Sequence, residues 1–290
     1  MKFSRRHSLL FFLAPYLMGA LLLIALPAAF SFYVAFTRYN GIAAPVFVGW
    51  ENFQLLRLDP LARVAFTNSL IFIAQSVPLR VIGALALALF LNRPRRGTAF
   101  YRAAVVLPTI VPDAAYALTW TWILNPLYGP LNASLRTLGL PAPPWLADSS
   151  WALPALLLAS LFPIGEGFII LLAGLRHIPR EVEDAARVDG ANRWQMFTSI
   201  TLPLLAPWLA LLSIRDVILS FQNTFTPAAL MTQGGPYYAT YFTPQFIYEA
   251  AFDRMDFGLA SLVMLLVFLV TVLLVTLVYF LFEEDGFHAD

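Results

Sequence analysis

The chain has 290 residues, of which 60% are hydrophobic and only 12% are charged, and its formal net charge is +1. Soluble domains average about 25% charged residues, so this composition indicates a protein that lies mostly in a membrane. Cysteine is absent and the three histidines (His7, His177, His288) are far apart, which excludes disulfides, thiol nucleophiles and a histidine metal cluster. No basic tract is present, so we expect no nucleic-acid partner.

Lysine usage removes one more class of function. The only lysine is Lys2, whereas a P-loop requires a lysine directly after its glycine-rich turn to reach the nucleotide phosphates. Whatever energy source the protein uses, a P-loop in this chain does not capture it. We therefore expect no cofactor on this chain.

Several apolar runs reach the roughly 20 residues that a helix needs to cross a bilayer. Because only helices satisfy their backbone hydrogen bonds within one segment in lipid, we predict an all-α polytopic membrane protein with a single domain over residues 1–290. The first run is too long for a signal peptide and precedes no soluble domain. The predicted spans are 9–36, 64–91, 100–124, 151–175, 202–221 and 257–282.

Arginine placement predicts the orientation of the spans. One side of the membrane receives the N-terminus and the connections after the second and fourth spans, and it holds the larger share of the basic residues. The positive-inside rule then places both termini and the 178–203 connection in the cytoplasm. The basic residues of this side are Lys2, Arg5, Arg6, Arg93, Arg95, Arg96, Arg102, Arg176, Arg180, Arg187 and Arg193. Those of the other side are Arg38, Arg57, Arg63, Arg136 and Arg254.

Polar side chains in the third span indicate a pathway or a partner, because polar groups are costly at membrane depth. Thr109, Asp113 and Tyr116 lie around the two prolines of LPTIVP. Prolines four residues apart should bend the helix and release carbonyls that can line a cavity. The alternative is that Asp113 is a structural ion-pair partner of Arg80.

The fourth span carries a carboxylate in LFPIGEGF, where one proline and two glycines loosen the helix. We predict that Glu166 either accepts hydrogen bonds from the hydroxyls of a polar solute or pairs with Arg80 or Arg215. Phe162 and Phe168 would offer apolar faces for stacking of solute rings, or else they face lipid or the core.

The fifth span ends in SFQNTF, where Gln222 and Asn223 offer donors and acceptors without charge. They suit a neutral solute, or else they only mark the end of a helix. Arg215 and Asp216 are adjacent, and neighbours on a helix point in different directions, so we do not expect them to pair with each other.

The 178–203 connection is polar and charged although it lies between two apolar spans. EVEDAARVD predicts a short amphipathic helix, and Gly190 ends it because glycine accepts the left-handed conformation at a helix C-terminus. NRWQMFTSI predicts a second helix, and Pro203 then opens the fifth span. Acidic residues such as Glu183 and Asp189 disfavour a loop lying on anionic lipid and favour docking into a protein cleft.

This connection resembles the coupling motif of ABC-importer permeases, which reads Glu-Ala-Ala, three residues, Gly, nine residues and Ile-x-Leu-Pro. Here Asp184–Ala186 is followed by Gly190 and by Ile200–Pro203, so the spacing agrees and only Asp184 departs from the motif. RGTAFYRAAVVLPTIVP and MTQGGPYYAT look like carbohydrate-uptake permeases of the maltose and glycerol-phosphate type, in a short six-helix form. The resemblance implies a permease subunit of a sugar importer in the inner membrane.

The resemblance also implies partners. These are a second permease subunit, a cytoplasmic ATPase dimer that holds ATP and Mg²⁺, an external sugar-binding protein and the membrane lipid, with a sugar as the solute. The residues expected to couple to the ATPase are Glu183, Asp184, Ala185, Ala186, Asp189, Gly190 and Ala191. The substrate pathway is expected to include Thr109, Asp113, Tyr116, Phe162, Glu166, Gln222 and Asn223.

Two other functions are alternatives to this one. A secondary transporter driven by an ion gradient would use Asp113, Glu166 and Asp216 as ion sites, although six helices are few and the 178–203 connection would then have no role. A membrane-embedded enzyme needs a catalytic constellation, and its nearest candidate is Asp113 with Glu166. Transport explains that pair better.

Overall fold

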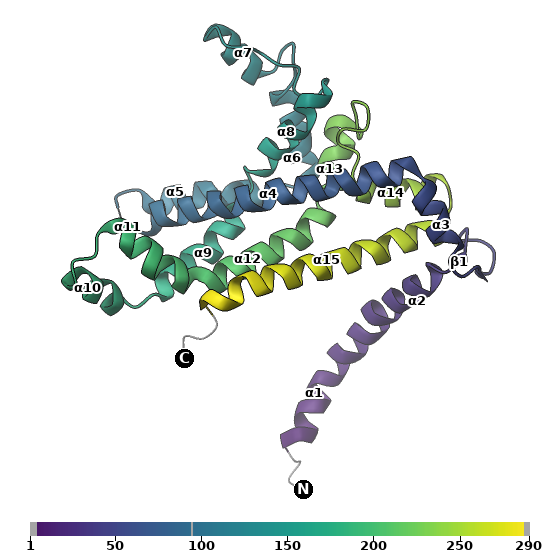
Figure 1. Ribbon diagram of the computed structural model, residues 1–290, viewed down its shortest axis with the longest axis horizontal. Coiled ribbons are helices and arrows are strands. Elements are labelled where there is room, and N and C mark those ends of the chain that lie inside the picture. Colours follow the sequence, from purple (N-terminus) through teal and green to yellow (C-terminus); the bar gives the residue numbers. More distant parts are fainter. Residues whose placement is uncertain (1–4, 94, 287–290) are drawn as a thin grey trace. The chain divides into compact units, whose positions relative to one another are not determined.

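The computed structural model describes residues 5–93 and 95–286 (Figure 1). Its elements are nearly all helices, which confirms the helical class predicted from the composition. In chain order the elements are α1 (Arg5–Ala20), η1 (Leu21–Ala25), α2 (Leu26–Val34), β1 (Thr37–Arg38), β2 (Val46–Phe47), α3 (Glu51–Leu58), α4 (Pro60–Asn92), α5 (Thr98–Val106), η2 (Leu107–Ile110), α6 (Asp113–Ile123), α7 (Pro130–Thr137), α8 (Ser149–Ser160), α9 (Gly165–His177), α10 (Arg180–Val188), α11 (Arg193–Met196), η3 (Phe197–Thr201), α12 (Leu202–Gln222), α13 (Phe225–Pro227), η4 (Ala228–Thr232), α14 (Thr243–Tyr248), η5 (Glu249–Asp253) and α15 (Phe257–Gly286).

One short pair of strands departs from the all-helical prediction. β1 and β2 are antiparallel, with Thr37 opposite Phe47. The buried side chain of Asn52 holds this turn by donating hydrogen bonds of 2.9 Å to the carbonyls of both Ala35 and Thr37. The amide side chain thereby satisfies two backbone carbonyls in and next to the short pair of strands.

The number of membrane spans depends on how bent helices are counted. Four helical stretches are long and apolar enough to cross a membrane, and they are Phe12–Val34, Pro60–Asn92, Arg193–Gln222 and Phe257–Leu281. Two further pairs qualify only if each bent pair is one span, namely Thr98–Ile110 with Asp113–Ile123, which meet at 102°, and Ser149–Ser160 with Gly165–His177, which meet at 48°. The described part of the chain therefore holds four to six candidate spans.

Prolines explain both bends. Val111 has an extended backbone directly before Pro112, as a proline ring requires of the residue that precedes it. Pro163 lies between α8 and α9, where it removes a backbone donor from the helical ladder. Each bend leaves a carboxylate, Asp113 or Glu166, in the first turn of the next helix, where the helix dipole favours negative charge.

The chain forms two compact units. As far as the structure describes them, one comprises residues 5–62 and 246–269, and the other comprises residues 63–245 and 270–286. The candidate site described below lies wholly within the second unit.

One hydrophobic core cluster of the second unit lies where α4, α9 and α12 pack together. Glycines let α9 approach α12 closely, because a Cβ on Gly174 would lie 2.7 Å from the ring of Trp208, and one on Gly167 would lie 3.0 Å from Leu212. The buried members of this core are Ala84, Ala88, Leu91, Phe168, Leu171, Leu172, Leu175, Leu205, Leu209 and Leu212.

Candidate functional site

A cavity of about 230 Å³ opens among α4, α6, α8, α9 and α12. Its lining is unusually polar for segments that qualify as membrane spans, and intramembrane charges of this kind mark solute pathways or structural ion pairs. The polar lining residues are Arg80, Thr109, Asp113, Tyr116, Ser160, Glu166, Arg215, Asp216, Ser220, Asn223 and Thr224.

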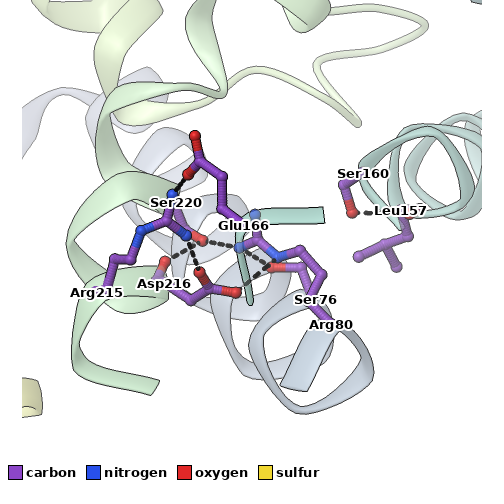
Figure 2. Close-up of polar contacts among 8 residues, drawn as sticks. All are labelled: Ser76, Arg80, Leu157, Ser160, Glu166, Arg215, Asp216 and Ser220. Carbon is purple, nitrogen blue, oxygen red and sulfur yellow. Dashed lines mark hydrogen bonds and ion pairs between the residues drawn. The ribbon is translucent and has the colours of Figure 1, made fainter. Parts of the chain in front are cut away.

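Four charged side chains from three helices form a network on the cavity wall (Figure 2). Asp216 of α12 is 7% exposed, and its Oδ2 lies 3.5 Å from Nε of Arg80 on α4. Its Oδ1 lies 3.0 Å from Nη1 of Arg215. Arg215 also pairs with Glu166 of α9, whose side chain is 55% exposed. The network therefore joins α4, α9 and α12 around one nearly buried carboxylate.

Hydroxyl groups complete the surroundings of Arg80. Its Nη2 donates to Ser220 and, at 3.4 Å, to Ser76 one turn earlier on α4. Ser220 donates in turn to the carbonyl of Asp216 at 2.7 Å. Nε of Arg80 has no hydrogen-bond partner among the described residues and has only the Asp216 carboxylate at ion-pair distance. Since an unpaired buried charge is costly, we regard Arg80 with Asp216 as a fixed part of the wall.

The pairing of Arg215 with Asp216 shows that the sequence prediction for these neighbours was wrong. Adjacent residues leave a helix about 100° apart, but a long arginine side chain can turn back to the next carboxylate. Arg80 pairs with Asp216 rather than with Asp113. Asp113 is exposed at the start of α6, and its side chain has no hydrogen bond or ion pair with another described residue.

Three more predicted pathway residues line the cavity, namely Thr109, Tyr116 and Asn223. The hydroxyl of Tyr116 donates to the carbonyl of Ala159 at 2.6 Å, and that of Thr109 donates to the carbonyl of Val106 at 2.7 Å. Both hydroxyls thus stabilise the bent helices, whereas the exposed Asn223 side chain is available to a solute.

Phe162 and Gln222 do not line the cavity. Phe162 lines an apolar groove instead, and its ring centroid lies 6.0 Å from that of Trp120. Gln222 is exposed beside the lining residue Asn223. The hydroxyls of Ser160 and Ser220 were missed, although Ser220 lies one turn after Asp216 and therefore on the same helix face.

The 178–203 connection is two helices joined at Gly190. Gly190 has φ +82°, and its N–H donates to the carbonyl of Arg187 at 3.1 Å. The N–H of Ala191 donates to the carbonyl of Ala186 at 2.9 Å. These two bonds and the left-handed glycine form a Schellman motif, so α10 ends where the sequence predicted.

Asn192 starts the next helix immediately. Its side chain accepts from the amide of Gln195, while the Gln195 side chain accepts from the amide of Asn192, which is a capping box. From Arg193 the helix continues through the π-helical turn η3 into α12, so it begins well before Pro203. Caps on both sides of Gly190 fix the direction of the chain.

The predicted coupling residues lie on α10 and just beyond it. Ala186 is buried, Glu183 and Ala191 are partly buried, and the others are exposed, namely Asp184, Ala185, Asp189 and Gly190. Two large apolar neighbours are exposed as well, Val188 by 88% and Trp194 by 70%. The loop thus presents acidic and apolar side chains together, which is typical of a surface that another protein covers.

Comparison with known proteins identifies the family of the chain. Residues 65–285 match the family described as "Binding-protein-dependent transport system inner membrane component". The probable ABC transporter permease protein YesP of Bacillus subtilis (strain 168) is 35% identical over 288 residues, which cover 96% of this chain and 91% of YesP. The sulfoquinovosyl glycerol transport system permease protein SmoG of Agrobacterium fabrum is 31% identical over 271 residues, which cover 92% of this chain and 87% of SmoG.

Solved structures share the fold. A chain of a bacterial ABC transporter involved in the import of the acidic polysaccharide alginate superposes with a TM-score of 0.84 at 23% identity, over 97% of this chain and 96% of that one. The chain therefore belongs to the binding-protein-dependent transport system inner membrane component family. It is a multi-pass permease subunit of an ABC importer, a transport component rather than an enzyme, and this membership decides against a transporter driven by an ion gradient alone.

Proposed function

We propose that the chain is one of two permease subunits of an ATP-driven carbohydrate importer, and that residues 178–203 pass the movement of an ATPase to the cavity. One observation carries the proposal. α9 begins at the cavity with Glu166 and leads into α10, whereas the helix after Gly190 carries Arg215 and Asp216 to the same cavity. A displacement of α10 therefore acts on both helices that hold the Glu166–Arg215 pair.

The proposal counts each bent pair as one span, which gives six spans with both termini in the cytoplasm. An even number of spans places the two ends on one side, and the arginine distribution favours the cytoplasmic side for them. The coupling residues on α10 would then meet a cytoplasmic ATPase dimer that holds ATP and Mg²⁺. The exposed acidic and apolar side chains there support such a contact.

The cavity suits a solute rich in hydroxyl groups. The carboxylates of Asp113 and Glu166 accept hydrogen bonds, and the amide of Asn223 both donates and accepts. All three side chains are exposed within the lining, so a solute can reach them. The glycerol-linked sugar named for SmoG points to the same substrate class. We infer that the second permease subunit completes the pathway and that an external binding protein delivers the sugar.

Purification from the native membrane in mild detergent, with mass spectrometry of the proteins that accompany the chain, tests this assembly. We expect a second permease and an ATPase. Ala185→Arg, which places a long cation on the exposed face of α10, should lose the ATPase and keep the second permease. Arg57→Gln, a change at an exposed arginine elsewhere in the chain, should keep both. Recovery of this chain alone, transporting a solute in vesicles with only an ion gradient, would contradict the proposal.

A further inference from the structure

An apolar groove of about 370 Å³ runs between the last turns of α4, the helix α5 and the connection from α8 to α9. Its walls include Phe90, Leu91, Tyr101, Ala104 and Phe162, and the Tyr101 hydroxyl is the one polar side-chain group in the lining. Phe90 is 68% exposed and Phe162 is 58% exposed. A solute with hydroxyl groups would find almost nothing to bind there.

The groove lies beside helices that qualify as membrane spans. α4 is a candidate span in its own right, and α5 belongs to the first half of a bent candidate span. Ala104 and Pro108 follow Tyr101 along α5 and η2, so the groove extends for more than one helical turn parallel to the helix. An apolar hollow of this length beside candidate membrane spans suits an acyl chain.

One end of the groove meets a basic loop. Arg93, Arg95 and Arg96 connect α4 to α5, are exposed, and make no ion pair with another described residue. Arg102 of α5 holds the end of α4, because its Nη2 and Nε donate to the carbonyl of Leu91 at 2.6 and 3.2 Å. Leu91 and Tyr101 line the groove on either side of this loop, so the arginines stand where a lipid headgroup would lie.

We propose that this groove binds one glycerophospholipid with a net negative headgroup. One acyl chain packs against Phe90, Ala104 and Phe162, and the phosphate lies at Arg95 and Arg96. A zwitterionic headgroup would bring its own cation to the three arginines, whereas an anionic one complements them. Arginines attract anionic headgroups, which accounts for the three arginines at the end of the groove. The apolar groove adds a binding surface for the acyl chain. The site is independent of which solute the permease carries.

Native mass spectrometry of the intact detergent-purified transporter, mixed with phosphatidylglycerol or with phosphatidylcholine of the same acyl chains, tests the site. We expect phosphatidylglycerol to be retained on this chain in preference to phosphatidylcholine. Arg95→Gln with Arg96→Gln should weaken its binding by about 30-fold, the factor that two arginines near an anionic lipid contribute. Arg57→Gln with Arg63→Gln removes the same charge from two other exposed positions and should leave retention unchanged.

A second pair of variants tests the groove itself. Ala104→Phe should displace the lipid by filling the groove, whereas Ala103→Phe, at the adjacent exposed position outside the lining, should not. Equal retention of the two lipids, or full retention of phosphatidylglycerol by Ala104→Phe, would overturn the proposal. A photo-crosslinking amino acid in place of Ala104 decides the case should Ala104→Phe fail to assemble. A lipid adduct supports the site, and an adduct with a helix of the second permease subunit overturns it.

Discussion

The cavity and the 178–203 loop use the same charged residue types in opposite ways. In the cavity, Arg80 and Asp216 come from different helices, and their side chains are only 18% and 7% exposed. On α10, Arg187 pairs with Glu183 and Asp184 one turn away, and all three side chains are more than a third exposed. Exposed pairs contribute little to stability, but breaking a buried pair is costly. The Arg80–Asp216 pair therefore maintains the structure of the cavity wall, whereas the charges on α10 are available to a partner.

The largest expected effect on stability comes from removing the buried carboxylate of Asp216. Asp216→Ala removes the one carboxylate that pairs with the Arg80 guanidinium among the described residues, and it should lower the free energy of unfolding by about 3–5 kcal/mol. Asp184→Ala on α10 should change it by no more than about 1 kcal/mol. Unfolding midpoints of the two purified variants provide the comparison, and similar losses would contradict the distinction.

A double variant sharpens the same point. Replacing both members of the pair, Arg80→Met with Asp216→Leu, removes the buried charges together and should recover much of the stability lost in Asp216→Ala. The comparison uses the same unfolding midpoints. No recovery would mean that Asp216 stabilises the wall mainly through Arg215.

The next effect tests the close approach of α9 to α12 behind the cavity. Gly174→Ala places a methyl group 2.7 Å from the ring of Trp208, and the required repacking should cost about 1–3 kcal/mol. Gly19→Ala is a matched control on another helix, because a Cβ there meets nothing within 4 Å. It should be neutral or slightly stabilising. A Gly174→Ala variant as stable as wild type would mean that the two helices are further apart.

A smaller effect on stability is expected at the half-exposed end of the network. Glu166→Gln should change the free energy of unfolding by less than about 1 kcal/mol, because water already screens its pair with Arg215. Uptake into proteoliposomes by the complete transporter should nevertheless fall, because this contact joins α9 to α12 across the cavity wall. Unchanged uptake would remove Glu166 from the pathway.

The sequence predicted the loop better than the cavity because the signals of the loop are local. Gly190 at a helix end and Asn192 three residues before Gln195 act through backbone groups only a few positions away. The cavity depends on the rotation and bending of separate helices. The 102° bend before Asp113 and the reach of Arg215 to Asp216 cannot be read from spacing alone.

The membrane spans were likewise predicted only in part. Their apolar runs are evident in the sequence, but proline acts differently at different positions. Pro112 breaks a helix, whereas Pro203 lies in a helix that continues from Arg193 to Gln222. The π-helical turn η3 ends two residues before Pro203 and changes the hydrogen-bond pattern of the helix there, which the local sequence pattern does not predict. Phe162 lies in the connection between α8 and α9 and Gln222 at the last residue of α12, and the direction of a side chain at such a break depends on tertiary packing.

The ratio of solute uptake to ATP hydrolysis in proteoliposomes, measured for two variants of Gly190, tests the central claim most directly. A Cβ there meets nothing within 4 Å, so the left-handed backbone at φ +82° is the constraint within this chain. Asn accepts that conformation and β-branched Val does not. The account predicts near-normal coupling for Gly190→Asn and a large fall in uptake per ATP hydrolysed for Gly190→Val, with both proteins still inserted in the membrane. Wild-type coupling in Gly190→Val would contradict the role assigned to the loop.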